Sequence, residues 1–421
     1  MIISANSRKR PTAPRQNRVT GLRKLKPGRI NLALILLIPL LLAPPNAAAG
    51  GRQEDKAEVR TDREEGADRV PQAARVRIRY ARGFTVEYSR DHKIVTVLNP
   101  WRGSRVRFRY ILVQRGTPPP PEAGGAQIIE VPVRSIVSLS ATYLAPMQML
   151  GIQGSLVGLD RFKYVYSPEI RSRIREGKIF ELGEASTLNI ELLLELAPDL
   201  IMTPSLGQEG DVHPKLMETG FKVAINADYM ESSPLGRSEW IKFLAVFFNL
   251  EQKAEQVFDA IADDYEKLVE KTRSIPARPT VFTEAPYQGS WWVPGGRSYM
   301  ATLLSDAGAR YIWSDDRSTG SVLLDFESVF EAASQAEFWL NTGTWNSLAA
   351  GLAVDERFRE FGAFQAGDVY NNNARVNKFG GNDYWESGVA RPNEILADLI
   401  RIFHPALLPS HQLKYYRRLG F

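Results

Sequence analysis

Cysteine is absent from this 421-residue sequence, and histidine occurs only four times. Without cysteine, these residues form no disulfide, no thiol nucleophile, no iron–sulfur cluster and no lipidated N-terminal cysteine. The four histidines lie far apart and lack the spacing of a metal site: His92, His213, His404 and His411. We therefore expect no metal held by protein side chains, and no cofactor.

The sequence also lacks the short motifs that usually mark a catalytic centre. It contains no Gly-x-Ser-x-Gly turn, no phosphate-binding loop and no His-Glu-x-x-His zinc motif. We therefore expect no catalytic residues. One enzymatic alternative stays open, because carboxylates such as Asp160 and Glu284 would form an acid pair if the fold placed them across a cleft. On that alternative the protein is a secreted hydrolase.

Acidic residues are missing from the first 49 positions, and this shapes the charge of the whole chain. Residues 1–29 carry nine Lys and Arg, and residues 30–49 carry no charge. The net charge of +5 therefore becomes −4 for the residues that follow. A basic segment, an apolar stretch and a final Ala47-Ala-Ala49 are typical of a secretory signal. We expect a cleaved signal peptide and a periplasmic protein that binds no nucleic acid; a retained anchor is the alternative.

A small β unit is expected next. Residues 50–74 are charged and poor in apolar side chains, which is typical of a flexible linker. Apolar and polar residues then alternate, as in Ile94–Leu98, with turns at Gly and Asn-Pro. This period of two predicts a small antiparallel β unit over 75–116. Its many arginines are most simply the solvated face of the sheet, and a proline run at 118–121 ends it.

Strands that alternate with helices fill the rest of the chain. The apolar runs Ile136–Leu139 and Leu156–Leu159 each end at polar side chains, and a helical stretch separates them. This alternation predicts an α/β lobe over 130–233. An amphipathic helical segment over 234–274 follows, and a second α/β lobe over 278–421. The predicted fold class is therefore α/β, with two mainly parallel lobes joined by a long helix and preceded by the β unit.

The candidate binding residues follow predicted strand ends or lie in predicted loops. Ligands of parallel sheets lie at the carboxyl ends of the strands. In the first lobe, four polar or aromatic residues follow such ends: Tyr143, Asp160, Arg161 and Tyr229. In the second lobe, six gather in loops near Gly-rich turns: Trp291, Trp292, Trp345, Asn382, Tyr384 and Trp385. Aromatic faces stack on flat ligands and polar groups orient them, so we predict that these residues line a cleft. For any single Trp taken alone, packing in the core is the more common explanation, so the prediction rests on the set.

The order and spacing of several segments between about 130 and 405 are those of a known family. The segments are Arg134–Ser140, Leu150–Ile152, Leu156–Gly158, Leu188–Ile201, Pro294–Gly296, Leu303–Gly308 and Pro392–Pro405. Through them the chain resembles the iron-siderophore and cobalamin class of ABC-transporter substrate-binding proteins. The resemblance implies two lobes joined by one rigid helix, with the ligand held between them. The β unit has no counterpart in the simplest members, and an envelope-tethered scaffold is a further alternative for it.

The resemblance also implies partners. Such a protein captures an iron-siderophore, a cobalamin-like ligand or a related metal chelate, and we expect it to act as a monomer that delivers this ligand to an ABC permease at the inner membrane. Members carry one surface acid on each lobe that docks on permease arginines. The first position falls near Glu209. The second falls at Leu304, which is not an acid, and Asp306 is two residues further on.

Overall fold

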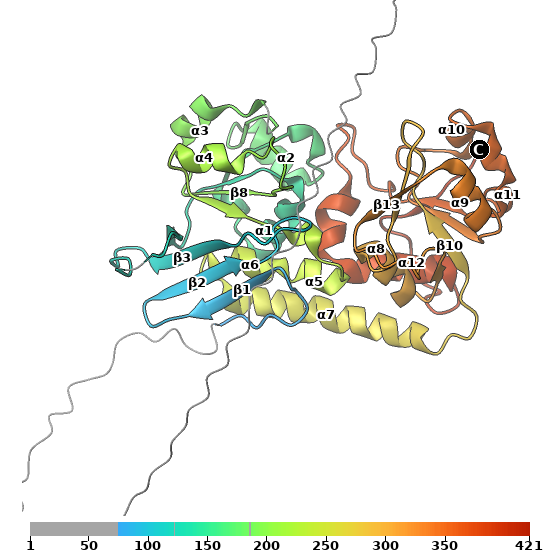
Figure 1. Ribbon diagram of the computed structural model, residues 1–421, viewed down its shortest axis with the longest axis horizontal. Coiled ribbons are helices and arrows are strands. Elements are labelled where there is room, and N and C mark those ends of the chain that lie inside the picture. The colour runs from blue at the N-terminus through green and yellow to red at the C-terminus, as the bar shows by residue number, and fades with distance from the viewer. Residues whose placement is uncertain (1–74, 122, 185–186) are drawn as a thin grey trace, which may run out of the picture. The chain divides into compact units, whose positions relative to one another are not determined.

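The computed structural model describes residues 75–121, 123–184 and 187–421. The predicted signal peptide and linker, residues 1–74, lie outside this part. Within it, the predicted α/β class is confirmed: two mainly parallel sheets, a long helix and a small N-terminal sheet (Figure 1).

The N-terminal sheet has four strands in the order β1-β2-β3-β4: β1 (Phe84–Tyr88), β2 (His92–Val97), β3 (Phe108–Gln114) and β4 (Gln127–Val131). The first three pair antiparallel, as predicted. β2 buries Lys93, Val95 and Val97 on one face, which is the expected period of two. β4 pairs parallel to β3 and lies past the predicted boundary at residue 116, so the unit is larger than its alternating pattern indicated.

The first lobe is a five-stranded, fully parallel sheet in the order β7-β6-β5-β8-β9. Its strands are β5 (Ile136–Ser138), β6 (Leu156–Leu159), β7 (Phe180–Glu181), β8 (Leu200–Thr203) and β9 (Val223–Ile225). Helices connect them: α1 (Leu144–Leu150), α2 (Pro168–Arg175), α3 (Ile190–Leu196) and α4 (His213–Glu218). Every residue of β5, β8 and β9 is buried, which explains why these strands read as continuous apolar runs.

Three helices follow the first lobe: α5 (Pro234–Ser238), α6 (Trp240–Val246) and α7 (Glu251–Arg273). The 23-residue α7 is amphipathic and buries one stripe that includes Ala254, Phe258, Ile261 and Tyr265. It packs against α1 and α6, and also against two helices of the second lobe, α8 (Tyr299–Asp306) and α12 (Pro392–Phe403). α7 is therefore the predicted long helix that joins the lobes.

The second lobe has a five-stranded sheet in the order β12-β10-β14-β15-β16, in which only β16 is antiparallel. Its strands are β10 (Thr280–Thr283), β12 (Arg310–Tyr311), β14 (Phe338–Leu340), β15 (Val369–Asn371) and β16 (Arg417–Arg418). A separate antiparallel ribbon pairs β11 (Trp291–Pro294) with β13 (Ser321–Leu324). The remaining helices are α9 (Phe326–Ala333), α10 (Leu348–Leu352) and α11 (Gly362–Ala366).

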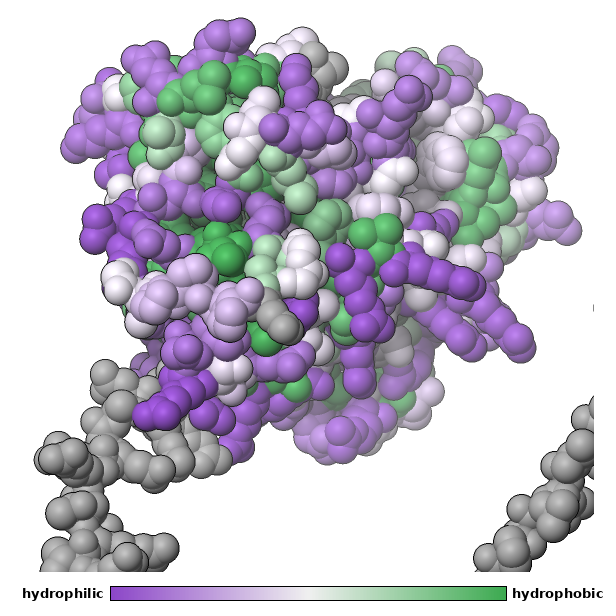
Figure 2. Space-filling view, turned by 60° about the vertical axis from the view of Figure 1, so that its left-hand side comes forward, coloured by the Kyte–Doolittle hydropathy of each residue, from purple (hydrophilic) through white to green (hydrophobic). Residues whose placement is uncertain are grey.

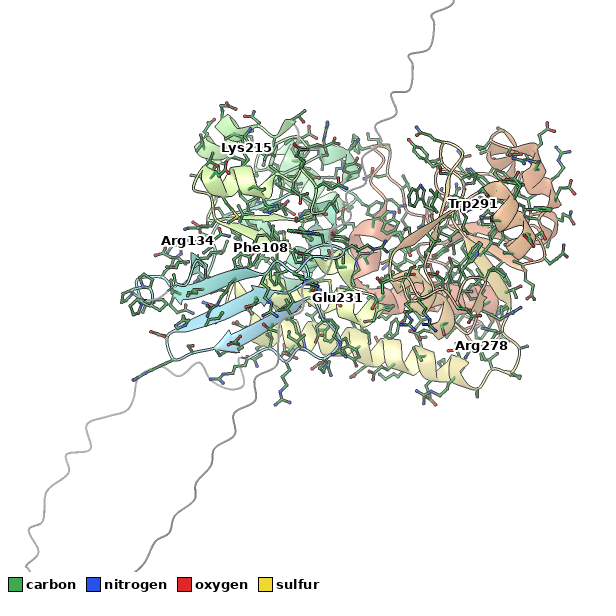
Figure 3. The ribbon with its side chains drawn as sticks, viewed as in Figure 1. Phe108, Arg134, Lys215, Glu231, Arg278 and Trp291 are labelled. Carbon is green, nitrogen blue, oxygen red and sulfur yellow. The ribbon has the colours of Figure 1, made fainter. Side chains whose placement is uncertain are left out.

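Two buried carboxylates hold the N-terminal segment onto α5 and α6. Glu239 is fully buried and accepts hydrogen bonds from the backbone N–H groups of Arg79, Tyr80 and Ala81 at 2.7–3.0 Å. Glu231, labelled in Figure 3, accepts hydrogen bonds from the backbone N–H groups of Arg82 and Gly83. Because these carboxylates would be costly to bury without such donors, the β unit is an integral part of the fold.

The described residues contain no helix that is both long and apolar enough to cross a membrane. On the face shown in Figure 2, hydrophobic side chains lie in separate patches between hydrophilic ones. Exposed apolar side chains of the first lobe include Leu194 and Leu206, which lie on different elements. This face therefore presents no single continuous apolar surface.

Candidate functional site

The carboxyl end of the first-lobe sheet holds a cavity of about 160 Å³. Asp160, which follows β6, lines it together with Glu184, Thr203 and Asp211. Oδ1 of Asp160 is buried and has no hydrogen-bond partner among the described residues. Burial raises the pKa of this carboxyl to about 6, and the charge of Glu184 adds to the rise. The predicted residue Asp160 therefore lies in a partly enclosed cavity that polar and apolar side chains line together.

The other three predicted residues of the first lobe make contacts within the protein. The buried Tyr143 donates its hydroxyl hydrogen to the backbone oxygen of Asn226 at 2.8 Å. Arg161 forms an ion pair with Glu184 at 3.2 Å. Tyr229 donates to the backbone oxygen of Ser205 at 2.7 Å and lies 3.2 Å from that of Pro100. Of the three, only Arg161 has a side chain more than a third exposed, at 37%.

A second group of polar side chains lies where the two lobes meet. We call Asp228, Arg237, Glu284, Tyr299 and Tyr384 the polar cluster. Asp228 and Arg237 come from the first lobe and α5, and form an ion pair at 3.1 Å with both side chains 12% exposed. Burial lowers the pKa of the guanidinium, but the charge and hydrogen bond of Asp228, together with Tyr299 and Tyr384, outweigh this effect, so the pKa lies above its usual value. Arg237 therefore stays charged.

The second lobe completes the polar cluster. The guanidinium of Arg237 lies 5.5 Å from the ring centre of Tyr299, the first residue of α8. α8 begins there because the hydroxyl of Ser298 accepts the backbone N–H of Ala301. Tyr384 is fully buried and close enough to Arg237 and Glu284 for their charges to shift titration. Tyr384, which the sequence predicted as a binding residue, thus lies near Arg237 and Tyr299, which it did not predict.

Unpartnered polar atoms mark this cluster. The hydroxyls of Tyr299 and Tyr384 are buried and have no hydrogen-bond partner among the described residues. The same holds for Thr283 and Thr342, at the carboxyl ends of β10 and β14. Burial raises the pKa of Glu284 to about 7, although the amide of Asn341 opposes the rise. Because buried polar groups are normally paired, such a concentration of free donors and acceptors favours a ligand site.

The polar cluster borders a small cavity between the lobes. A cavity of about 20 Å³ is lined by Tyr143, Asp228 and Arg237 on one side and by Val389 and Ala390 on the other. This volume holds about one water molecule. A chelate of several hundred cubic ångströms therefore enters this cavity only if the segments that line it are displaced locally.

One such segment crosses from the second lobe to the first. The carboxylate of Glu386 accepts the backbone N–H of Tyr166 at 2.6 Å and that of Ser167 at 3.0 Å. The side-chain amide of Asn377 donates to the backbone oxygen of Val165 at 2.9 Å. Burial raises the pKa of Glu386 to about 7. The segment 377–390, which contains Tyr384, is thereby attached to the start of α2.

The predicted aromatic residues of the second lobe divide into two groups. Trp291, labelled in Figure 3, is fully buried and Trp345 is 5% exposed. Both belong to the aromatic core of the lobe. Trp292 is 51% exposed and Trp385 is 49% exposed. The period of two along β11 explains why neighbouring tryptophans point to opposite faces. The partly buried Asn382 donates its side-chain amide to the backbone oxygen of Asn372 at 3.1 Å.

The two predicted docking acids have different surroundings. Glu209 is exposed in the loop between β8 and α4. Asp306 accepts a hydrogen bond from the Tyr265 hydroxyl at 2.5 Å, and burial raises the pKa of its carboxyl. It lies at the end of α8 beside a surface cavity of about 480 Å³ along α7.

Sequence reasoning did not single out Asp228, Arg237 or Tyr299. Tyr299 follows the Pro294-Gly-Gly296 segment that the family resemblance did recognise, so its position next to that turn was a usable signal. Asp228 and Arg237 lie nine residues apart and carry no local motif. No group of three or more potential metal ligands occurs in the part of the chain that the structure describes. The arrangement can therefore bind and orient a ligand through hydroxyls, one ion pair and aromatic faces.

Comparison with known proteins shows the family to which the chain belongs. The profile of a family described as periplasmic binding protein matches residues 136–375, more than half of the chain. The chain belongs to the periplasmic binding protein family. The match covers the first lobe, the joining helix and most of the second lobe, and it begins after the N-terminal sheet.

Relatives and solved structures extend the match. Two uncharacterised lipoproteins of Methanocaldococcus jannaschii are each 26% identical. One alignment covers 80% of this chain and 84% of the relative, and the other covers 93% and 99%. A possible iron-binding, periplasmic solute-binding protein of Staphylococcus epidermidis has a TM-score of 0.51 at 19% identity, covering 65% of this chain and 99% of that one. A periplasmic binding protein of Veillonella parvula has a TM-score of 0.53 at 14% identity, covering 74% and 98%. At these identities the solved structures show the fold.

Proposed function

We propose that this protein captures an iron-siderophore, a cobalamin-like ligand or a related metal chelate between its lobes and delivers it to an ABC importer. It does so in the periplasm, after a signal peptide is cleaved, and it acts as a monomer without catalysing a reaction. Family membership supports a binding function, and the likeness to the iron-binding candidate of Staphylococcus epidermidis supports iron as the cargo.

The observation that carries the proposal is the polar cluster. Tyr299 and Tyr384 present two buried hydroxyls, unpartnered among the described residues, beside the ion pair of Asp228 and Arg237. Hydroxyls and a guanidinium bind the oxygen atoms of a chelate, while any iron or cobalt arrives inside its own ligand. Asp160 and its cavity add polar groups at the edge of the first lobe.

Titration of the exported protein with four probes tests binding. The probes are an iron(III) tris-catecholate, an iron(III) tris-hydroxamate, haemin and cyanocobalamin, and the readouts are tryptophan fluorescence and calorimetry. We expect one class to bind one-to-one with a dissociation constant of about 1 μM or below, which corresponds to about −8 kcal/mol. If none of the four binds below about 100 μM, the proposed cargo is wrong.

Delivery requires contact with a permease, and Glu209 is the exposed acid that tests it. We expect Glu209→Ala to weaken binding to permease-containing membranes without changing ligand affinity. Glu218→Ala, an exposed acid on α4 of the same lobe, is the matched control. Equal effects of the two variants would contradict docking through Glu209.

The hydrolase alternative is tested by turnover. Burial raises the pKa of both Asp160 and Glu284, to about 6 and about 7. However, Asp160 lines the cavity at the edge of the first lobe, whereas Glu284 belongs to the polar cluster. We expect no multiple turnover of glycoside or ester substrates. If the protein turns over such a substrate and both Asp160→Asn and Glu284→Gln lose this activity, the hydrolase function is correct and the proposed binding function is wrong.

A further inference from the structure

The loop between β2 and β3, residues 99–107, contacts the cleft-facing edge of the first lobe. The indole of Trp101 lies against Gly207, where a Cβ atom would come within 2.3 Å of the ring. The Tyr229 hydroxyl lies 3.2 Å from the backbone oxygen of Pro100. Gly207 and Tyr229 follow β8 and β9, so both contacts lie at the carboxyl ends of the parallel strands. This is the edge at which such sheets bind ligands.

The same loop also contacts the second lobe. β2 points toward that lobe in Figure 1, and a guanidinium nitrogen of Arg102 lies 1.7 Å from the position that a Cβ atom on Gly320 would take. The backbone oxygen of Gly320 accepts a hydrogen bond from Gly295 at 2.8 Å. Gly295 lies three residues before Ser298, which caps α8 and thus positions Tyr299 of the polar cluster. One loop of the N-terminal sheet therefore contacts both lobes, through residues that lie next to Asp228 in sequence or pair with the turn before Tyr299.

The bridging loop is positively charged. Arg102, Arg105 and Arg107 are exposed, and their side chains form no ion pair or hydrogen bond with any residue in the described ranges. The acids that most closely precede Gly320 in sequence are Asp315 and Asp316. The carboxylate of Asp316 accepts a hydrogen bond from the backbone N–H of Ser318 at 2.8 Å, within its own turn. The guanidinium of Arg102 therefore lies against Gly320 of the second lobe, and no carboxylate of the described residues forms an ion pair with it.

We propose that the β2–β3 loop forms part of the ligand site and that Arg102 selects a chelate with a negative charge. The inference rests on the proposed function, and it narrows the cargo from metal chelates in general to anionic ones, such as a tris-catecholate or a carboxylate complex. A guanidinium binds catecholate and carboxylate oxygens through charge-assisted hydrogen bonds. The loop lies outside the residues that match the family profile, so this contribution is specific to chains with the N-terminal sheet.

A pair of arginine variants tests the proposal. Arg102→Ala removes the charge at the lobe contact. Arg109→Ala is the matched control, because Arg109 is exposed on β3 of the same sheet and its guanidinium lies near Gly124, in the loop before β4. We expect Arg102→Ala to weaken binding of the iron(III) tris-catecholate by about fivefold to tenfold, and Arg109→Ala by less than twofold. Added salt should weaken wild-type binding more than that of Arg102→Ala.

A third variant moves the guanidinium without removing its charge. The three atoms nearest to a Cβ atom at Gly320 all belong to the flexible Arg102 side chain, so we expect Gly320→Ala to displace that side chain at little cost to the fold. We expect a loss of affinity similar to that of Arg102→Ala, and no further loss in the double variant, because both changes remove one interaction.

The outcomes separate this inference from the proposed function. If the wild type binds none of the four probes, the proposed function fails and this inference fails with it. If it binds only the uncharged tris-hydroxamate or cyanocobalamin, the binding function stands and the anionic specificity is wrong. If it binds the tris-catecholate and Arg102→Ala matches Arg109→Ala, the role of Arg102 is wrong. Additive losses from Arg102→Ala and Gly320→Ala would also contradict it.

Discussion

The carboxylate of Glu386, in the second lobe, accepts a hydrogen bond at 3.0 Å from the backbone N–H of Ser167, in the first. The adjacent N–H of Tyr166 donates to the same carboxylate at 2.6 Å. Ser167 is also the N-cap of α2, so the contact joins the segment that carries Tyr384 to the start of a first-lobe helix. Since only 2% of Glu386 is exposed, burial raises its pKa to about 7.

This contact predicts a dependence of stability on pH. The pKa of Glu386 is raised above its ordinary value of 4.5, so between about pH 5 and 7 the folded state binds more protons than the unfolded state. The free energy of unfolding should therefore fall as pH rises through this window. Glu386→Gln removes the titration and leaves a similar shape. We expect the wild type to lose about 1–3 kcal/mol relative to Glu386→Gln between pH 5 and 8, measured by urea unfolding. Parallel pH profiles would contradict this assignment.

The unpartnered hydroxyls of Tyr299 and Tyr384 predict opposite effects on stability and binding. An unsatisfied buried hydroxyl costs free energy, so replacing Tyr by Phe should leave the free energy of unfolding unchanged or raise it by up to about 1 kcal/mol. If the hydroxyls bind the ligand, the same changes should weaken binding by about tenfold each. Tyr265→Phe, which removes a hydroxyl already bonded to Asp306, is the control. Unchanged affinity in both Tyr299→Phe and Tyr384→Phe would remove these hydroxyls from the site.

The neighbours Trp291 and Trp292 provide a matched pair. Trp291 is fully buried, with its indole N–H donating to the backbone oxygen of Thr283 at 3.3 Å, whereas Trp292 is 51% exposed. We expect Trp291→Ala to cost about 3–5 kcal/mol of stability, as for other buried large aromatics. Trp292→Ala should cost less than about 1 kcal/mol. If the Trp292 side chain contacts the ligand, Trp292→Ala weakens ligand binding. Equal thermal stability of the two variants would contradict the placement of the two side chains.

Glu239 predicts how firmly the N-terminal sheet is attached. Its carboxylate accepts three backbone N–H groups and the ammonium of the buried Lys242 at 3.0 Å. Glu239→Ala leaves that ammonium and those donors without this partner, so we expect a loss of about 3–5 kcal/mol in the free energy of unfolding. Glu87→Ala, an exposed acid on β1, should be nearly neutral. A small effect of Glu239→Ala would favour a detachable β unit and thus the scaffold alternative.

The parts of the fold that follow from local pattern were predictable, and those that depend on long-range packing were not. Alternation along β1 to β3 and the apolar runs of β5, β6 and β8 correctly indicated strands. The stripe of Ala254, Phe258, Ile261 and Tyr265 indicated the joining helix. β4 was missed because its place is fixed by backbone pairing with β3 and not by its own pattern.

The candidate site was predictable only at the level of segments. The position of Tyr384 beside a turn signalled a loop, but its burial against Arg237 depends on how the lobes pack. Trp291 and Trp345 were predicted as cleft residues but are buried in the core, because no local signal separates a core tryptophan from one in a cleft. The contact of Arg102 with Gly320 joins residues more than 200 positions apart, and no local pattern encodes it.

Hydrogen–deuterium exchange, with and without the probe that binds most tightly, tests most directly whether the ligand lies between the lobes. Backbone N–H groups that a ligand covers exchange more slowly. We expect slower exchange at once in α5 around Arg237, which follows the first lobe, and in two segments of the second lobe, the turn before Tyr299 and the segment 377–390. Slower exchange along α7 beside Tyr265, or in one lobe alone, would contradict a ligand held between the lobes.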